Sequence, residues 1–332
     1  MTGARRGRGV AFALAVGAVS WAWSEVGFWA HFRVDDNPVV WVLTWLLYSL
    51  VAYLVLRVLR WHPATGLAPL FVVGALYGWL VEGTVANTVY LALPVSIVWT
   101  ALAWHALLTV VVGWYAVPRA LQRGGLRAVL WCAAVGFAWG CWGIGWWGAP
   151  PDKEQVAATS HPVSYAVFVT LVTAVAALGY GLQHACHPGD ADLATRWPLR
   201  VAVGLLLLWA IPVVVVPLPW APLVLSLLLL LGLATLRRFP SGSNESGGEV
   251  LGWRFGVPWP RLIPIAAIPL VAVATYLAAS PLSGRATGSG VVYAGFLAFV
   301  VVLSVTGAGL LVWSLWRAWR PRTQSELIDA TR

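Results

Sequence analysis

The sequence predicts an all-α, polytopic integral membrane protein whose helices, about ten of them, form one transmembrane bundle. Sixty per cent of its 332 residues are hydrophobic and 10% are charged, whereas about a quarter of the residues of a soluble domain are charged. Apolar segments close to the ~20 residues that cross a hydrocarbon core of ~30 Å recur along the whole chain. No stretch between them is long enough to fold as a separate domain.

The predicted membrane spans follow one another with short connections. They cover residues 9–30, 38–59, 67–90, 94–117, 127–149, 162–183, 199–216, 218–236, 261–280 and 290–316. The first span begins with basic residues, as a signal peptide does, but its apolar run continues through Trp29, which predicts an uncleaved helix. The pair 199–216 and 218–236 is joined by Pro217 and Pro219 and forms either two spans or one re-entrant hairpin.

The positions of the basic residues predict that both termini are cytoplasmic. An even number of spans places the two termini on the same side of the membrane. With the N-terminus inside, all of the 21 Lys and Arg residues except Arg33, Lys153 and Arg285 fall on the inner side, as the positive-inside rule requires. We therefore predict a multi-pass protein of the cell membrane. The lipid bilayer is its expected partner, and nucleic acid is not, because the basic residues do not cluster on a folded surface.

The chain predicts a single transmembrane domain over residues 1–332 with two chemically unequal halves. The five helices within 9–149 carry nearly all of the intramembrane polar residues, whereas the five within 162–316 consist mostly of Leu, Val and Ala. A cytoplasmic loop at 237–260 has the composition of a flexible linker. No inverted repeat of five plus five helices, which would indicate a carrier, is visible in the sequence.

Three ionisable residues, Glu25, Glu82 and His105, lie inside predicted spans. A charge at the centre of a bilayer costs about 3 kcal/mol on insertion scales, and such residues face the bundle interior or a water-filled cavity. Each also has a structural interpretation: Glu25 can pair with Arg33 or be hydrated, Glu82 can be a hydrogen-bonded carboxyl group, and His105 can be a neutral imidazole between two helices.

Helical spacing predicts an inward face for each of these residues, since side chains four residues apart lie on one side of an α-helix. The three sets are Gly74, Gly78, Glu82 and Ala86; Ala101, His105, Thr109 and Gly113; and Gly17, Trp21, Glu25 and Trp29. The first two sets are rich in small residues that let helices approach closely. We expect Glu82 and His105 to converge, with Glu25 and Asn87 completing a ligand-binding or proton-relay site in the outer half of the bundle.

The span 127–149 adds an aromatic face to this candidate site. Trp139, Trp142 and Trp146 recur at spacings of three and four, and Gly136 and Gly140 form a close-packing GxxxG pair. Aromatic faces attract cations, so we include Trp139 and Trp142 in the site and expect a small cationic or amphipathic ligand. The alternative is an aromatic belt at the membrane interface.

No motif points to a metal, a cofactor or a catalytic nucleophile. H-E-x-x-H, C-x-x-C and the paired-Glu signature of CAAX-type intramembrane proteases are absent. Cys132, Cys141 and Cys186 lack ligand spacing and are interpreted as packing residues. The polar loop 183–192 is interpreted as a solvated turn, so no metal site and no catalytic residue is assigned.

These observations leave three hypotheses for function. The preferred one is a small-solute or proton-coupled permease, supported by the titratable groups inside the bundle. The others are an intramembrane enzyme acting on a lipid or isoprenoid substrate, with a glutamate as general acid or base, and an accessory membrane subunit whose polar residues only join helices. The sequence does not predict the oligomeric state.

Overall fold

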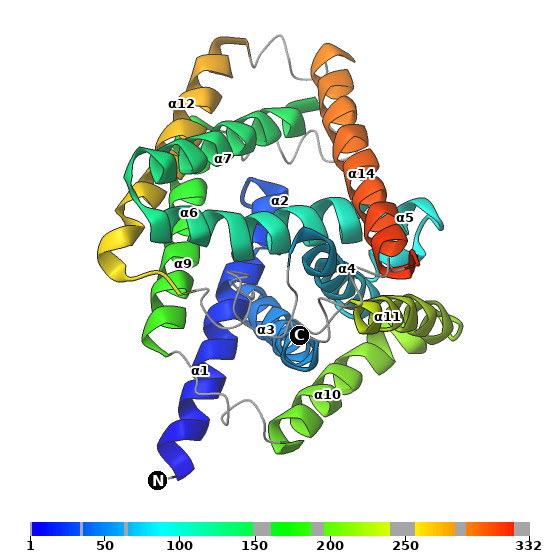
Figure 1. The fold of residues 1–332 in the computed structure, drawn as a ribbon. Coiled ribbons are helices and arrows are strands. Elements are labelled where there is room, and N and C mark those ends of the chain that lie inside the picture. The colour runs from blue at the N-terminus through cyan, green and yellow to red at the C-terminus, as the bar shows by residue number, and fades with distance from the viewer. Residues whose placement is uncertain are drawn as a thin grey trace. The chain divides into compact units, whose positions relative to one another are not determined.

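A computed structural model describes residues 2–33, 36–62, 66–148, 161–186, 196–239, 256–282 and 290–321 of the chain (Figure 1). All regular secondary structure in these ranges is helical. Nine of the described helices are long and apolar enough to cross a membrane, and the helix Leu199–Val215 is also apolar but shorter. The predicted all-α, multi-pass fold class is confirmed.

Every predicted span has a counterpart in the structure. The spanning helices are Gly7–Trp29, Pro38–Trp61, Leu67–Thr84, Val95–Arg123, Gly125–Gly145, Pro162–Ala185, Ala221–Arg238, Trp259–Ala279 and Gly290–Trp319. The prediction of cytoplasmic termini and of a single domain over 1–332 stays a prediction. The linker at 240–255, Lys153, Arg285 and the end of the polar loop, 187–192, lie outside the described residues.

The chain divides into two compact units that interleave along the sequence. Unit 1 comprises Met1–Ser49, Val112–Asp192 and Phe255–Leu303, and unit 2 comprises Leu50–Val111, Leu193–Arg254 and Ser304–Arg332. Three helices continue from one unit into the other, namely α3 (Pro38–Trp61), η3 (Trp99–Ala116) and α14 (Gly290–Trp319). Each unit therefore contains helices from both halves of the sequence.

Unit 1 is built on two helix pairs, α7 on α12 and α1 on α9. Apart from the three shared helices, its described elements are α1 (Thr2–Trp21), η1 (Ala22–Val26), α2 (Gly27–Trp29), α6 (Val117–Arg123), α7 (Gly125–Gly145), η4 (Trp146–Gly148), α9 (Pro162–Ala185), η6 (Trp259–Ala266), α12 (Ala267–Ala279) and η7 (Ser280–Leu282). A Cβ at Gly136 would overlap the carbonyl oxygen of Ile268, and one at Gly140 would lie 2.9 Å from that of Ala272. The predicted close-packing role of this glycine pair is confirmed.

Unit 2 is organised around α4 (Leu67–Thr84), of which nearly every residue is buried. The remaining elements are η2 (Thr88–Tyr90), α5 (Val95–Val98), α10 (Arg196–Ala210), η5 (Ile211–Val215) and α11 (Ala221–Arg238). α11 packs along α4, with Gly232 against the side chain of Leu76. η3 packs on α4 at Gly74 and Gly78.

The structure corrects two predictions about the third and fourth spans. The third helix ends at Thr84 rather than at residue 90, because the chain turns at Asn87, whose φ of 62° is left-handed; Asn adopts this conformation more readily than most residues. The fourth span is a π-helix over Trp99–Ala116 rather than an α-helix. Glu82 thus lies in the last turn of its helix, nearer to the helix end than the sequence predicts.

Candidate functional site

Glu82 and His105 form a direct contact in unit 2. The Oε1 atom of Glu82 on α4 lies 2.5 Å from the Nε2 atom of His105 on η3. Both residues are 4% exposed. The expectation that these two residues converge on an inward face is confirmed, and their role stays a prediction.

Small residues bring the two helices close enough for this contact. A Cβ on Gly74 would lie 2.8 Å from the Cα of Ala106, and a Cβ on Gly78 would overlap the carbonyl group of Ala101. Long helical side chains lean towards the N-terminus of their helix, so the carboxyl group of Glu82 extends back along α4 towards this zone of close approach. Gly74 and Gly78 of the predicted small-residue stripe therefore place the pair, whereas Ala86, the last member of that stripe, lies beyond the end of α4 and is exposed.

His105 is held by its helix and by an aromatic neighbour. The ring of Tyr77 on α4 packs edge-to-face against the imidazole, with the ring centroids 5.9 Å apart. Ala101, His105, Thr109 and Gly113 are all buried, as the spacing of four residues predicts. The π-helical hydrogen bonds of η3 run from residue i to i+5, a geometry that is rare outside single turns and often occurs at functional sites.

The second oxygen of the Glu82 carboxyl group is also buried. Oε2 has no hydrogen-bond partner among the described residues, and an unpaired polar atom in an apolar interior is costly. The pair remains electrically neutral in two ways: as a carboxyl group beside a neutral imidazole, and as a carboxylate beside an imidazolium. In either form the two side chains hold one proton between them.

Asn87 supports the loop after α4 and does not contact the Glu82–His105 pair in any described interaction. Its Nδ2 donates a hydrogen bond to the carbonyl oxygen of Val213 in η5, at 3.1 Å. Nearby, the hydroxyl of Tyr90 donates to the carbonyl oxygen of Gly83, at 2.9 Å. These bonds fold the segment after Thr84 back over the end of α4. A ligand-binding role for Asn87 stays a prediction.

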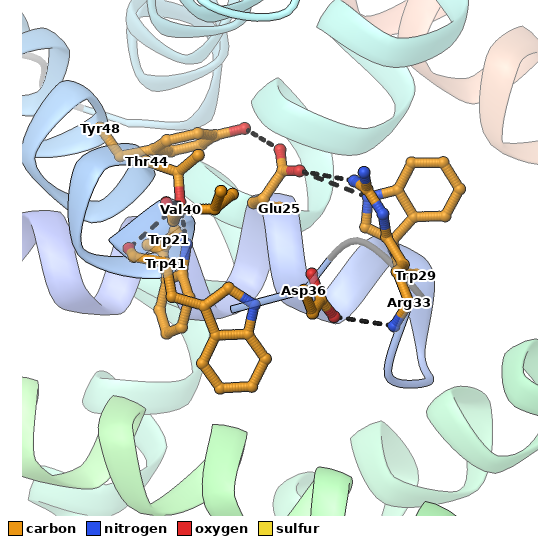
Figure 2. Close-up of polar contacts among 9 residues, drawn as sticks. All are labelled: Trp21, Glu25, Trp29, Arg33, Asp36, Val40, Trp41, Thr44 and Tyr48. Atoms are coloured by element: carbon orange, nitrogen blue, oxygen red, sulfur yellow. Dashed lines mark hydrogen bonds and ion pairs between the residues drawn. The ribbon is translucent and has the colours of Figure 1, made fainter. Parts of the chain in front are cut away.

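Glu25 occupies a different polar cluster, in unit 1 (Figure 2). Its Oε2 accepts a hydrogen bond from the hydroxyl of Tyr48 at 2.9 Å, and its Oε1 accepts one from Nε1 of Trp29 at 3.3 Å. Oε1 also lies 3.6 Å from Nη1 of Arg33. The interpretation that Glu25 pairs with Arg33 is thus confirmed. The predicted convergence of Glu25 with Glu82 and His105 stays a prediction.

A small pocket adjoins Glu25. It is lined by Trp21, Glu25, Val26, Trp29, His31, Arg33, Asp36, Val40, Trp41, Thr44 and Phe168. The predicted common face of Trp21, Glu25 and Trp29 is therefore confirmed. The cavity volume of the pocket is about 20 Å³, which is room for about one water molecule.

The three tryptophans of α7 and η4 cap the end of the first spanning helix. Nε1 of Trp139 donates to the carbonyl oxygen of Gly27 at 3.0 Å. Trp142 and Trp146 both donate to the carbonyl oxygen of Phe28, at 2.5 and 3.1 Å. Carbonyl groups in the last turn of a helix lack partners within the helix, and these indoles satisfy them. A ligand contact through Trp139 or Trp142 stays a prediction.

No family model, curated protein or solved structure matches this chain. Among the described residues no three His, Cys, Asp or Glu side chains gather as metal ligands. Cys132 is buried, Cys141 is exposed, Cys186 is partly buried, and all three are free thiols.

Sequence reasoning missed two residues that shape the Glu25 site. Tyr48, which donates to Glu25, and Trp41, which lines the pocket, lie on the second span and were not singled out. A signal for Tyr48 was present, because a hydroxyl group in the middle of an apolar span needs a hydrogen-bond partner. Trp41 carried no comparable signal in a chain with 23 tryptophans.

Proposed function

We propose that this membrane protein is a proton-coupled permease for a small solute and that the Glu82–His105 pair binds and releases the coupling proton. The observation that carries the proposal is the buried carboxyl–imidazole contact of 2.5 Å between two spanning helices. Ionisable groups inside a membrane are costly and commonly mark proton relays and solute pathways.

The burial of the pair supports coupling between protonation and conformation. With one shared proton the pair is neutral. Gain or loss of a proton leaves a net charge, which is strongly disfavoured in an environment of low dielectric constant. The proton can therefore exchange only when α4 and η3 separate enough to hydrate Glu82 and His105. A membrane protein that must move its helices to exchange a proton has the central requirement of a coupled carrier.

The experiment uses the purified full-length chain in proteoliposomes that contain a pH-sensitive dye. A panel of organic ammonium compounds, amino acids, sugars and short carboxylates is added outside in turn, and the internal pH is followed. We expect at least one solute to drive proton movement in the wild type and Glu82→Gln to abolish it, because the amide cannot exchange a proton at this position.

The matched control is Thr109→Val, which changes a buried polar residue on the same face of η3 as His105. It should keep solute-driven proton movement. If Glu82→Gln retains that movement at the wild-type rate, the pair is not the proton site. If no solute drives proton movement in a folded protein, the accessory-subunit hypothesis, in which the pair only joins two helices, replaces the permease.

A further inference from the structure

We propose that the pocket beside Glu25 is a binding site for a small organic cation, an ammonium or guanidinium compound, and that the side chain of Arg33 occupies this site in the structure (Figure 2). The site lies in unit 1, and the proposal does not depend on the role of the Glu82–His105 pair in unit 2.

The guanidinium group of Arg33 lies where such a ligand would bind. Its Cζ atom is 4.7 Å from the centroid of the Trp29 ring, within the range of a cation–π contact. Its Nη1 atom is 3.6 Å from Oε1 of Glu25. A positive planar group thus contacts an indole and a carboxylate, the two kinds of partner that proteins combine to bind organic cations.

Two further indoles and a second carboxylate line the pocket. The indoles of Trp21 and Trp41 and the carboxylate of Asp36 line it together with Glu25 and Trp29. Trp21 and Trp41 pack edge-to-face with centroids 5.6 Å apart, so they support each other. Removal of Arg33 would leave two carboxylates and three indoles around the vacated space. A lining of this kind strongly favours binding of a cation.

Glu25 is positioned by contacts that do not involve Arg33. The hydroxyl of Tyr48 and the indole N–H of Trp29 both donate to its carboxylate. Glu25 lies in the π-helical turn Ala22–Val26, where the N–H of Gly27 bonds to the carbonyl oxygen of Ala22. This local widening of the helix is a geometry frequent at functional sites. The anionic wall of the pocket is therefore organised before any ligand arrives.

The Arg33–Glu25 contact is weak enough for a ligand to replace it. The two side chains are 30% and 27% exposed, and their closest atoms are beyond hydrogen-bond length. Partly exposed ion pairs contribute little to stability. Because about 20 Å³ is open in the pocket, a ligand larger than water must displace the guanidinium group. Arg33 therefore acts as a tethered competitor that sets the affinity of the site.

The test is isothermal titration calorimetry of the full-length protein in detergent with methylguanidinium chloride, with sodium chloride titrated as the blank. If Arg33 fills the site in about nine of ten molecules, its removal raises the apparent affinity about tenfold. We expect Arg33→Ala to bind methylguanidinium at least that much more tightly than the wild type. Adding Glu25→Gln to Arg33→Ala should abolish binding.

The matched control is Arg119→Ala. Arg119 also stacks on an aromatic ring, with its Cζ atom 5.4 Å from the centroid of Tyr115, so its loss removes an equal charge and a similar contact. It should bind methylguanidinium as the wild type does. The proposal is overturned if Arg33→Ala binds no more tightly than the wild type or if the double variant binds as tightly as Arg33→Ala. Arg33→Gln serves for the same comparison if the alanine variant does not fold.

Discussion

Glu82 and His105 contact each other directly, and both side chains are buried in unit 2. A buried polar group that loses its partner costs about 1–3 kcal/mol, whereas replacing both partners by apolar groups of similar shape is close to neutral. The same contact that supports a proton site therefore makes a prediction about stability that is independent of transport.

We expect Glu82→Leu to lower the stability of the purified protein by about 2 kcal/mol, because it leaves the imidazole of His105 buried beside an apolar group. The double variant Glu82→Leu/His105→Leu should recover most of this loss. Thermal midpoints of the wild type, both single variants and the double variant at one fixed pH give the coupling energy. If the losses of stability in the two single variants add up to the loss in the double variant, the two side chains do not interact directly.

Tyr90 makes a prediction about pH. It lies in η2 between two spans, and burial raises its pKa to about 12 from an ordinary value of about 10. Since the pKa in the folded protein is the higher one, the stabilising contribution of the hydroxyl is complete below pH about 10 and declines as the pH rises towards about 12.

Tyr90→Phe removes the hydrogen bond to Gly83, which contributes about 1 kcal/mol. We expect the variant to melt below the wild type at pH about 8, and the difference to narrow at pH about 11. Thermal midpoints of the two proteins at both pH values check this. A difference that widens with pH would show that the hydroxyl is not a protonated donor in the folded protein.

At the scale of elements, the positions of Glu82 and His105 depend on backbone contact between α4 and η3. Gly78 is the tightest point, because a Cβ there would overlap the carbonyl group of Ala101. Added atoms in a tightly packed interior typically cost about 1–3 kcal/mol. Gly204 on α10 is a matched helical glycine, with no atom within 4 Å of an added Cβ.

We therefore expect Gly78→Ala to destabilise the protein by about 1–3 kcal/mol through separation of the two helices. Gly204→Ala should be neutral or stabilise by up to about 1 kcal/mol, because alanine is the better helix former. The thermal midpoints of the two variants compare a glycine against which another helix packs with a glycine that has free space beside it. The change in helix propensity is the same at both positions. Equal effects at both positions would mean that α4 and η3 are not in backbone contact.

The sequence predicted where these helices lie but not their internal geometry. The spacing of Ala101, His105 and Thr109 correctly predicted a buried face. It did not predict that η3 is a π-helix or that Glu25 lies in a π-helical turn, because residues four apart share a face in either geometry. The choice between hydrogen bonds to i+4 and to i+5 depends on how neighbouring helices pack.

At the scale of the whole molecule, the hydropathy pattern predicted the fold class and the order of the spans. Within a bilayer every backbone polar group must be bonded internally, so a long apolar segment has to be a helix of nearly fixed length. The helix Leu199–Val215 is the exception, because it is shorter than the others, and its pairing with α11 still permits a re-entrant hairpin. Hydropathy records apolar length and does not separate these two arrangements.

Tertiary structure decided the partners of the polar residues. The sequence alone determined that Glu25, Glu82 and His105 are buried or partly buried in a helical membrane protein, since each lies in a long apolar segment. Only the packing showed that Glu82 contacts His105, that Glu25 contacts Tyr48 and Arg33, and that the tryptophans of α7 and η4 donate to Gly27 and Phe28. The reason is physical. Burial in a membrane follows from the apolar length of one segment, whereas lipid is as apolar as the helix faces and does not select which helices meet, so close packing and hydrogen bonds make that selection.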